Sequence, residues 1–198
     1  MAKNKVKYNL KNAHYAMLTV DEEGTVSYAS PVALPGAVSI SLDANGEPEN
    51  FYADGVAYYV INNNMGYDGD LELAMIPEDF RVLALNETLD DKKVLIENAN
   101  TELNPFALLF EFDGDVKHIR HVLYNCSASR PGIEGKTNEE NREVQTETLS
   151  IKATPLASGV VKAKTGDSTD AAVYADWYKA VYMPSIAETG SGTDQAGV

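Results

Sequence analysis

YDGDLELAMI, residues 67–76, is the clearest β-strand pattern in the sequence. Apolar side chains fall on one side of the pleat: Leu71, Leu73 and Met75. Acidic side chains fall on the other side: Asp68, Asp70 and Glu72. Successive residues of a strand point to opposite faces, so this alternation predicts a strand with one face in a core and the other in water.

Turn signals recur about every ten residues along the rest of the chain, which is typical of all-β sandwiches and barrels. Asn45-Gly46 predicts a hairpin turn between the alternating segment 37–42 and a strand at 50–53. Asp54-Gly55 then turns the chain into a strand at 56–62. The other expected strands are 6–10, 14–20, 25–28, 106–113, 116–127, 144–154 and 160–165. We therefore expect a mainly β, sandwich-like or barrel-like fold.

Two segments break the strand pattern and predict helices. Residues 77–85 begin with Pro-Glu-Asp, which suits a first helical turn because acidic side chains favour the positive end of the helix dipole. Residues 168–183 carry Val173, Trp177 and Val181 at helical spacing. We expect a short flanking helix and a C-terminal helix, the latter anchored on the sheet by Trp177.

The same pass along the chain predicts one domain. Residues 1–184 are expected to form a single β domain, and 185–198 a flexible C-terminal tail rich in small and polar residues. Within the domain, 127–144 is a long polar loop, with the sequence SASRPGIEGKTNEENRE at 127–143. Loops of this length inside a compact domain are usually functional or disordered.

Composition limits the classes of partner. The 198 residues carry 30 acidic and 16 basic side chains, a formal net charge of −14, and 44% of them are hydrophobic. Such an acidic surface is repelled by phosphate backbones and anionic membranes, and tight nucleic-acid binding requires clustered Lys and Arg. No stretch is apolar enough to predict a membrane span. Cys126 is the single cysteine, which fits a reducing interior.

Motifs for catalysis or cofactor binding are weak throughout. Gly135–Thr137 reads Gly-Lys-Thr, but a phosphate-binding loop needs a glycine at position 130, which is arginine. His118 and His121 have a spacing that places them on opposite faces of a strand, which disfavours a zinc site. Residues 43–47 resemble a fragment of a calcium loop but are better explained by a β-turn. We expect no catalytic residues, no cofactor and no metal site, and a non-enzymatic protein.

Several segments resemble the major tail proteins, or tail tube proteins, of long-tailed phages of Gram-positive bacteria. The likeness begins in MAKNKVKYNLKNAHYAMLT, residues 1–19, and continues in PVALPGAVSISLDANGE, residues 31–47. It includes 66–73, the Ile-Pro-Glu-Asp-Phe at 76–80 and the Tyr-Ala-Asp-Trp-Tyr at 174–178. The resemblance covers most of residues 1–184 and contains no catalytic signature.

The resemblance implies a tail-tube fold and an assembly. Such proteins form hexameric rings that stack into a tube, and four strands from each subunit join in an inner barrel. The implied partners are further copies of the chain, the tape-measure protein and the tail-completion proteins, while DNA passes through without sequence-specific binding. The implied location is the virion tail, assembled in the bacterial host cytoplasm.

Physical estimates agree with that assembly. Twenty-four strands about 4.8 Å apart and tilted by about 40° form a backbone circle roughly 45–50 Å across. Side chains then leave a bore of roughly 35–40 Å, wider than a DNA duplex of about 20 Å. Within such a ring we interpret Asp68, Asp70 and Glu72 as lining the bore; the alternative is that they face solvent outside.

The polar loop leads to a second hypothesis about assembly. Its charged residues would contact the next ring in the stack: Arg130, Glu134, Lys136, Glu139, Glu140 and Arg142. The alternative is a disordered loop without a partner.

Two other functions also stay open at this point. One is a monomeric β-sandwich that binds carbohydrate or protein through exposed tyrosines, and the other is a different virion structural protein, such as a capsid decoration or tail-terminator protein.

Overall fold

The computed structural model describes residues 3–137 and 143–185. The strands in chain order are β1 (Lys7–Val20), β2 (Val26–Tyr28), β3 (Val32–Ala33), β4 (Ala37–Asn45), β5 (Glu49–Ala53), β6 (Val56–Ile61), β7 (Gly66–Leu73), β8 (Thr88–Leu89), β9 (Leu95–Ile96), β10 (Phe106–Gly114), β11 (Ile119–Ala128), β12 (Glu147–Ala153) and β13 (Lys162–Lys164). The helices are α1 (Glu78–Leu83) and α2 (Ala171–Asp176). The expected mainly β fold with two short helices is confirmed.

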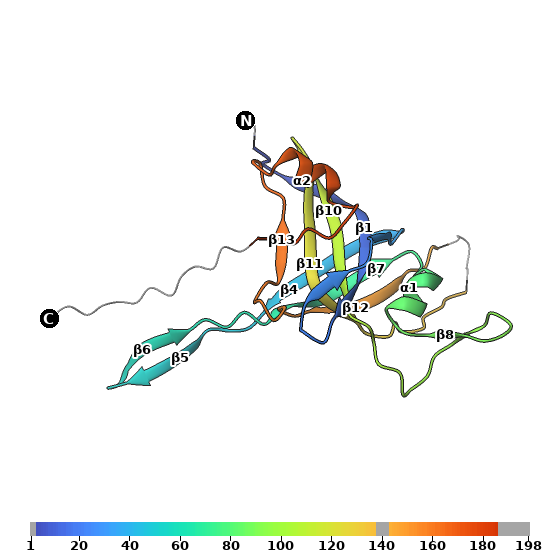
Figure 1. Ribbon diagram of the computed structural model, residues 1–198, viewed down its shortest axis with the longest axis horizontal. Coiled ribbons are helices and arrows are strands. Elements are labelled where there is room, and N and C mark those ends of the chain that lie inside the picture. The colour runs from blue at the N-terminus through green and yellow to red at the C-terminus, as the bar shows by residue number, and fades with distance from the viewer. Residues whose placement is uncertain (1–2, 138–142, 186–198) are drawn as a thin grey trace.

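One curled antiparallel sheet forms the body of the molecule (Figure 1). Its main path runs β2-β1-β10-β11-β12-β7-β4, with β3 added beside β1 and β13 beside β11. The curl brings β4 close to β1. In the described part of the chain no ladder joins these two strands, so the sheet is barrel-like but stays open between them.

The inside of the curl holds the larger core, and α1 closes it. Phe80 of α1 is fully buried and packs edge-on against Tyr15 and Phe106, with ring centroids 5.0 and 5.3 Å away. Leu71 and Leu73 of β7 point into the same core. The apolar face expected for this strand is therefore confirmed for these two residues, whereas Met75 lies beyond the strand and is exposed.

A second core covers the opposite face of β1, β10 and β11. Trp177, which directly follows α2, is 2% exposed and packs there with Leu109 and Val122. Its indole Nε1 donates to the carbonyl of His121 at 3.4 Å. Trp177 is therefore buried against the sheet, as an anchor for the C-terminal helix requires. With both faces covered, β10 begins with an uninterrupted apolar run, FALLF, which periodicity alone cannot assign to one face.

The N-terminal strand is longer than the sequence pattern predicts. Two expected strands, 6–10 and 14–20, are one strand, β1, because Asn9 and Asn12 adopt positive φ angles of 55° and 51° and are absorbed as irregularities in its pairing with β10. Asparagine tolerates this conformation better than most residues. The polar stretch between the two expected strands therefore bends β1 without ending it.

The hairpin predicted at Asn45-Gly46 is wrong, because β4 does not pair with the strand that follows it, β5. β4 pairs with β7, with Asn45 opposite Gly66, and the β5–β6 hairpin is inserted between these two strands. A Cβ atom on Gly46 would lie 2.3 Å from the carbonyl oxygen of Asn63, so this glycine permits a close passage of the two stems. The turn predicted at Asp54-Gly55 is confirmed, with positive φ at both positions.

Three other details differ from the expectations. α1 and α2 are shorter than the predicted 77–85 and 168–183, since each spans six residues. The small β8–β9 hairpin was not predicted, because its strands are only two residues long. The tail expected at 185–198 lies, apart from residue 185, outside the described residues.

Candidate assembly surfaces

Three adjacent strands, β4, β7 and β12, carry a polar outer surface that we call the acidic face. Each row across the sheet joins one residue from each strand. The rows are Asp43–Asp68–Lys152, Ser41–Asp70–Ser150 and Ser39–Glu72–Thr148. The three acids expected to share a face of β7 therefore do so, next to a fourth carboxylate, Asp43. Ser127 of β11 lies beside Lys152 and extends this surface to a fourth strand.

The three acids of β7 accept hydrogen bonds from neutral donors, and among the described residues Asp68 Oδ1 is buried without a partner. Asp68 accepts from Asn45 at 2.6 Å, and Asp70 accepts from Ser150 at 2.8 Å. Glu72 accepts from Thr146 at 2.6 Å and from Ser39 at 2.8 Å, and these two hydrogen bonds lower the pKa of its carboxyl. Among the described residues none of these acids forms an ion pair with a basic side chain.

The backbone beneath the acidic face is closely packed. Gly69, at the centre of β7, has no room for a side chain, because an added Cβ would lie 1.9 Å from the carbonyl oxygen of Ser41 on β4. On the reverse side Leu71 and Leu149 are fully buried in the larger core. The carboxylates thus stand on a rigid sheet with a fixed outward direction.

β4 forms an edge of the sheet. It pairs with β7 on one side, and within residues 3–137 and 143–185 no strand pairs with its other side. Its nine residues present a long row of backbone donors and acceptors there. Val38, on this edge strand, is 51% exposed. Such edges are templates for pairing with another chain.

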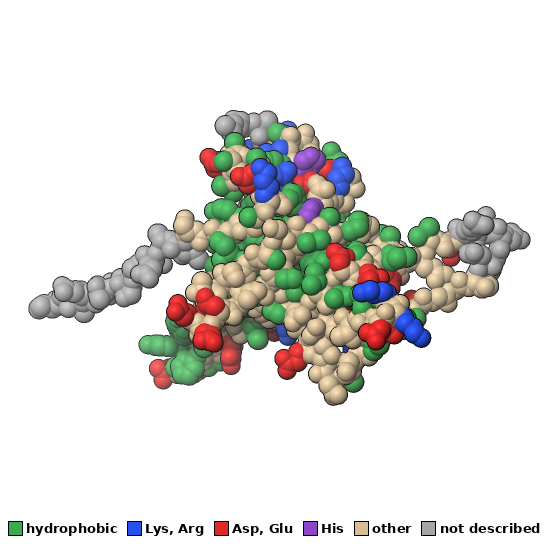
Figure 2. All heavy atoms as spheres, turned by 45° about the vertical axis from the view of Figure 1, so that its right-hand side comes forward, with side chains coloured by type: hydrophobic (Ala, Val, Ile, Leu, Met, Phe, Trp, Pro, Cys, Tyr) green, Lys and Arg blue, Asp and Glu red, His purple; other side chains and the backbone are tan. Residues whose placement is uncertain are grey.

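The β5–β6 hairpin, which we call the arm, projects from the body (Figure 1). Figure 2 shows its hydrophobic side chains gathered at the lower left of the molecule. Exposed large side chains come from both strands: Phe51, Tyr52, Val56, Tyr58, Tyr59, Val60 and Ile61. None of them belongs to either core. An isolated two-stranded hairpin is marginal in water, and exposed apolar patches mark interaction sites, so this arm is a candidate contact surface.

The polar loop at 127–144 is only partly described. Arg130 forms an exposed ion pair with Glu97, which follows β9. Glu134 and Lys136 are exposed, and the amide of Gln145 bonds the backbone of Lys136 in both directions. The other three residues predicted to contact a neighbouring ring lie outside the described residues: Glu139, Glu140 and Arg142.

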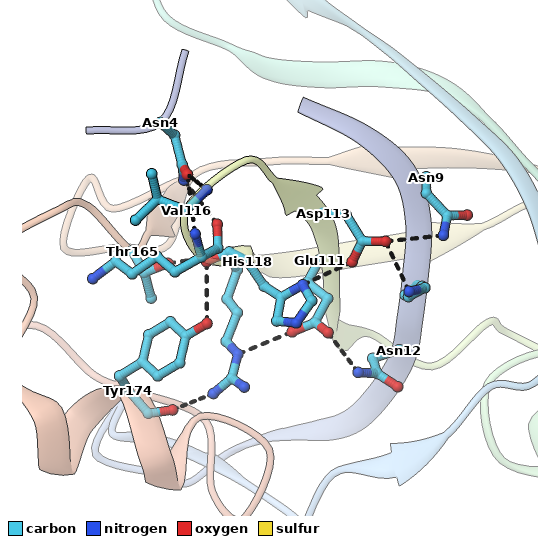
Figure 3. Close-up of polar contacts among 12 residues, drawn as sticks. Asn4, Asn9, Asn12, Glu111, Asp113, Val116, His118, Thr165 and Tyr174 are labelled. Carbon is cyan, nitrogen blue, oxygen red and sulfur yellow. Dashed lines mark hydrogen bonds and ion pairs between the residues drawn. The ribbon is translucent and has the colours of Figure 1, made fainter. Parts of the chain in front are cut away.

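A buried polar cluster at the upper end of the molecule was not predicted from the sequence (Figure 3). Glu111 of β10 is 2% exposed and accepts from Asn12 at 2.6 Å and from Arg120 at 2.9 Å. The Arg120 guanidinium also lies 3.9 Å from the ring centre of Tyr174 and bonds its carbonyl. The cluster therefore joins β1, β10, β11 and α2.

Asp113, two residues further along β10, completes this cluster. Its carboxylate contacts Lys11 at 2.7 Å, Asn9 at 3.0 Å and His118 at 2.7 Å. The hydrogen bonds from Lys11 and Asn9 lower the pKa of Asp113. Asn9 and Asn12 are the two positive-φ residues of β1, so each irregularity of that strand aims an amide at a buried acid. The sequence signal that could have revealed this cluster is the pair of acids, Glu111 and Asp113, that follows the apolar run of β10.

The expected separation of the two histidines agrees with the contacts they make. His118 contacts Asp113, whereas the ring of His121 stacks on Phe110 at 5.1 Å. Within the described ranges no group of three or more His, Cys, Asp or Glu side chains is placed to hold a metal ion. No helix in the same ranges is long and apolar enough to cross a membrane.

Comparison with solved structures gives a likeness in fold. No family model matches the sequence, and no curated protein matches it. One solved structure of similar fold is a chain of the anti-feeding prophage baseplate, determined by cryo-electron microscopy with sixfold symmetry. The match covers 85% of this chain and 99% of that chain, at 10% identity and a TM-score of 0.46. A likeness at this level leaves the function to be argued from this chain's own residues.

Proposed function

We propose that this protein is a non-enzymatic structural subunit of a phage tail tube, in which six copies form a ring and stacked rings enclose a channel for DNA. The observation that carries the proposal is the position of the acidic face beside the free edge of β4. Together they supply one polar surface that could line a channel and one unpaired strand through which the sheet can continue into a neighbour.

The number of strands supports ring closure. The polar surface spans β4, β7, β12 and the end of β11, so that six subunits would contribute 24 strands. This is the number for which the bore estimate, roughly 35–40 Å, admits a DNA duplex. A head-to-tail contact closes into a ring when the rotation per subunit divides a full turn.

The charge of the acidic face suits a channel through which DNA moves. In this proposal Asp68, Asp70 and Glu72 line the bore, and the side chains that donate hydrogen bonds to them are neutral. Basic side chains would bind the phosphates and release counterions, which would hold DNA in place. Carboxylates repel the phosphates instead, so that DNA does not adhere to the wall.

The remaining surfaces would serve the other contacts of a tail. The loop residues Arg130, Glu134 and Lys136 are exposed and charged, as a polar contact between stacked rings requires. The tape-measure protein would occupy the bore before DNA, and tail-completion proteins would cap the stack. The site of action is then the virion tail, after assembly in the host cytoplasm.

A single substitution on β4 tests the role of its free edge. Val38→Lys adds a charge to the exposed edge strand and should keep the protein monomeric at concentrations where the wild type forms rings. Val20→Lys is the matched control, because Val20 is a similarly exposed valine on β1, which is already paired with β2 and β10. Sedimentation velocity measures the assembly state of both variants. Normal rings from the Val38→Lys protein would refute pairing through β4.

The exposed tyrosines favour a second candidate, a monomeric module that binds carbohydrate or protein. Tyr52, Tyr58 and Tyr59 on the arm are each more than 60% exposed, and aromatic rings are common at such binding surfaces. This candidate predicts a monomer at every concentration with glycan binding that is lost in a Tyr58→Ser/Tyr59→Ser variant. Concentration-dependent assembly without glycan binding would exclude it.

A further inference from the structure

We infer that the arm of one copy docks into a lysine-rimmed groove on a neighbouring copy, an inference that rests on the proposed function. The groove is a cavity of about 340 Å³ within the curl of the sheet, with β4 on one side and the β10–β11 pair on the other. The apolar, lysine-rimmed groove would receive the apolar arm of the neighbour. This contact would link adjacent subunits in addition to strand pairing.

The arm has the composition of a docking element. Its cross-strand pair Phe51–Tyr59 lies on one face, and Tyr58 is 72% exposed. Aromatic side chains, tyrosine above all, dominate the binding energy of protein interfaces when a pocket covers them. Residues 47–65 also contain three carboxylates, Glu47, Glu49 and Asp54, and no Lys or Arg.

The groove has the complementary composition. Its floor is apolar and aromatic, formed by Ile40, Leu42, Phe110 and Phe112. Two lysines lie on aromatic rings at its rim. Lys7 is 4.6 Å from the ring centre of Phe112, and Lys162 is 4.1 Å from that of Tyr67. None of the described residues that line the groove is an acid. Acidic residues on the arm would therefore meet ammonium groups at the groove rim, which fixes partner and orientation.

In this inference the arm comes from a second copy. The arm leaves the body where β4 ends and β7 begins, and Met65 N donates to the Asn45 carbonyl at 2.9 Å to hold the two stems together. From this base the arm points away from the body, at the opposite end from α2 and the N-terminus (Figure 1). A contact between different surfaces of identical copies is head-to-tail, as ring and stack formation require.

Disulfide trapping tests this contact directly. Tyr58→Cys on the arm and Lys162→Cys at the groove rim, combined in one chain, should yield covalent multimers beyond dimers when assembled protein is oxidised. The native Cys126 is buried, and burial raises the pKa of its thiol to about 12, so it stays unreactive. Each single-cysteine variant, and Tyr58→Cys with Ser27→Cys on the distant strand β2, should stop at dimers.

Charge reversal provides an independent measurement on the same contact. Glu49→Lys/Asp54→Lys on the arm, or Lys7→Glu/Lys162→Glu on the groove rim, should each raise the concentration needed for half-assembly by about tenfold. The chain with all four substitutions should recover most of this loss, because the charges are again complementary. Unchanged melting temperatures would show that the variants are folded.

The outcomes separate this inference from the proposed function. Two results would overturn the docking of the arm and leave the tube proposal standing. One is normal ring formation without disulfide-linked multimers beyond dimers. The other is a chain with all four charge substitutions that assembles no better than the chains with two. A wild-type protein that stays monomeric under all conditions would overturn both.

Discussion

Glu111 and Arg120 form the most buried ion pair of the described residues, and the rest of the polar cluster is arranged around them. The carboxylate has three partners, Asn12, Arg120 and Tyr178, so that both its oxygens are satisfied without water. A buried charge that loses its partner is costly, because the remaining charge has neither water nor a counterion. The cluster therefore fixes the position of α2 relative to the sheet.

Glu111→Gln tests this role. The substitution preserves the shape of the side chain but leaves the Arg120 guanidinium without its countercharge, so the free energy of unfolding should fall by about 3 kcal/mol. Chemical denaturation measures the change. The matched control is Asp176→Asn, which breaks the exposed Asp176–Lys179 pair and should cost less than about 0.5 kcal/mol. Equal effects of the two substitutions would contradict the assignment.

His121 gives the fold a predicted pH dependence. Burial, followed by the neighbouring Lys164, Lys7 and Lys162, lowers the pKa of His121 from 6.5 to about 4. Between these values the unfolded chain binds a proton that the folded chain does not, so stability should be complete above about pH 6.5 and should fall as the pH decreases toward 4. The loss attributable to this residue is at most roughly 3 kcal/mol.

Unfolding free energies at pH 7, 5.5 and 4.5 measure this dependence. His121→Phe retains a ring against Phe110 and removes the titrating group, so its stability should decline less than that of the wild type over this range. Parallel declines of the two proteins would show that other groups, such as Asp113 and Glu72, account for the acid sensitivity.

At the scale of elements, Trp177 is the main attachment of the α2 segment. Trp177→Ala removes a nearly fully buried side chain from the second core and should cost about 3–5 kcal/mol, which lowers the melting temperature on the order of 10 °C. Tyr58→Ala is a suitable control, because it truncates an aromatic side chain that contacts neither core. A melting temperature unchanged by Trp177→Ala would contradict the anchoring role.

The polar loop supports a separate prediction. Deleting residues 132–141 removes the exposed residues 132–137 and the four residues that follow them, and it leaves both flanking strands, β11 and β12, intact. The monomer should fold normally by circular dichroism, since no described residue of the deleted segment belongs to a core. Assembly into tubes should be lost, as judged by electron microscopy. Tubes of normal length from the deletion variant would show that the loop makes no essential ring-to-ring contact.

Sequence patterns predicted single elements better than their partners. The alternation at 67–73 identified β7 and its acidic side because the two faces of that strand meet different environments. Asn45-Gly46 marked the end of β4 but not a hairpin turn, because β4 pairs with β7 across the inserted arm and such pairing is a long-range choice. The Glu111 cluster was missed for the same reason: its members come from four distant segments.

At the scale of the whole molecule, charge and shape are unevenly distributed. Lys and Arg side chains gather at the upper end in Figure 2, whereas the arm at the lower left carries acids and exposed apolar residues. Six copies of a chain at −14 carry −84 in a ring, so self-repulsion opposes assembly and salt should promote it. Edge pairing and burial of the arm are the contacts that would offset this repulsion.

Electron microscopy of concentrated wild-type protein, extended to a reconstruction, tests the central claim most directly. The account predicts sixfold rings or tubes with a bore of roughly 35–40 Å, with the carboxylates of Asp68, Asp70 and Glu72 on the inner wall and the β4 edge joined to a neighbouring chain. A protein that remains monomeric at every concentration, or a ring with these three acids on its outer wall, would contradict it.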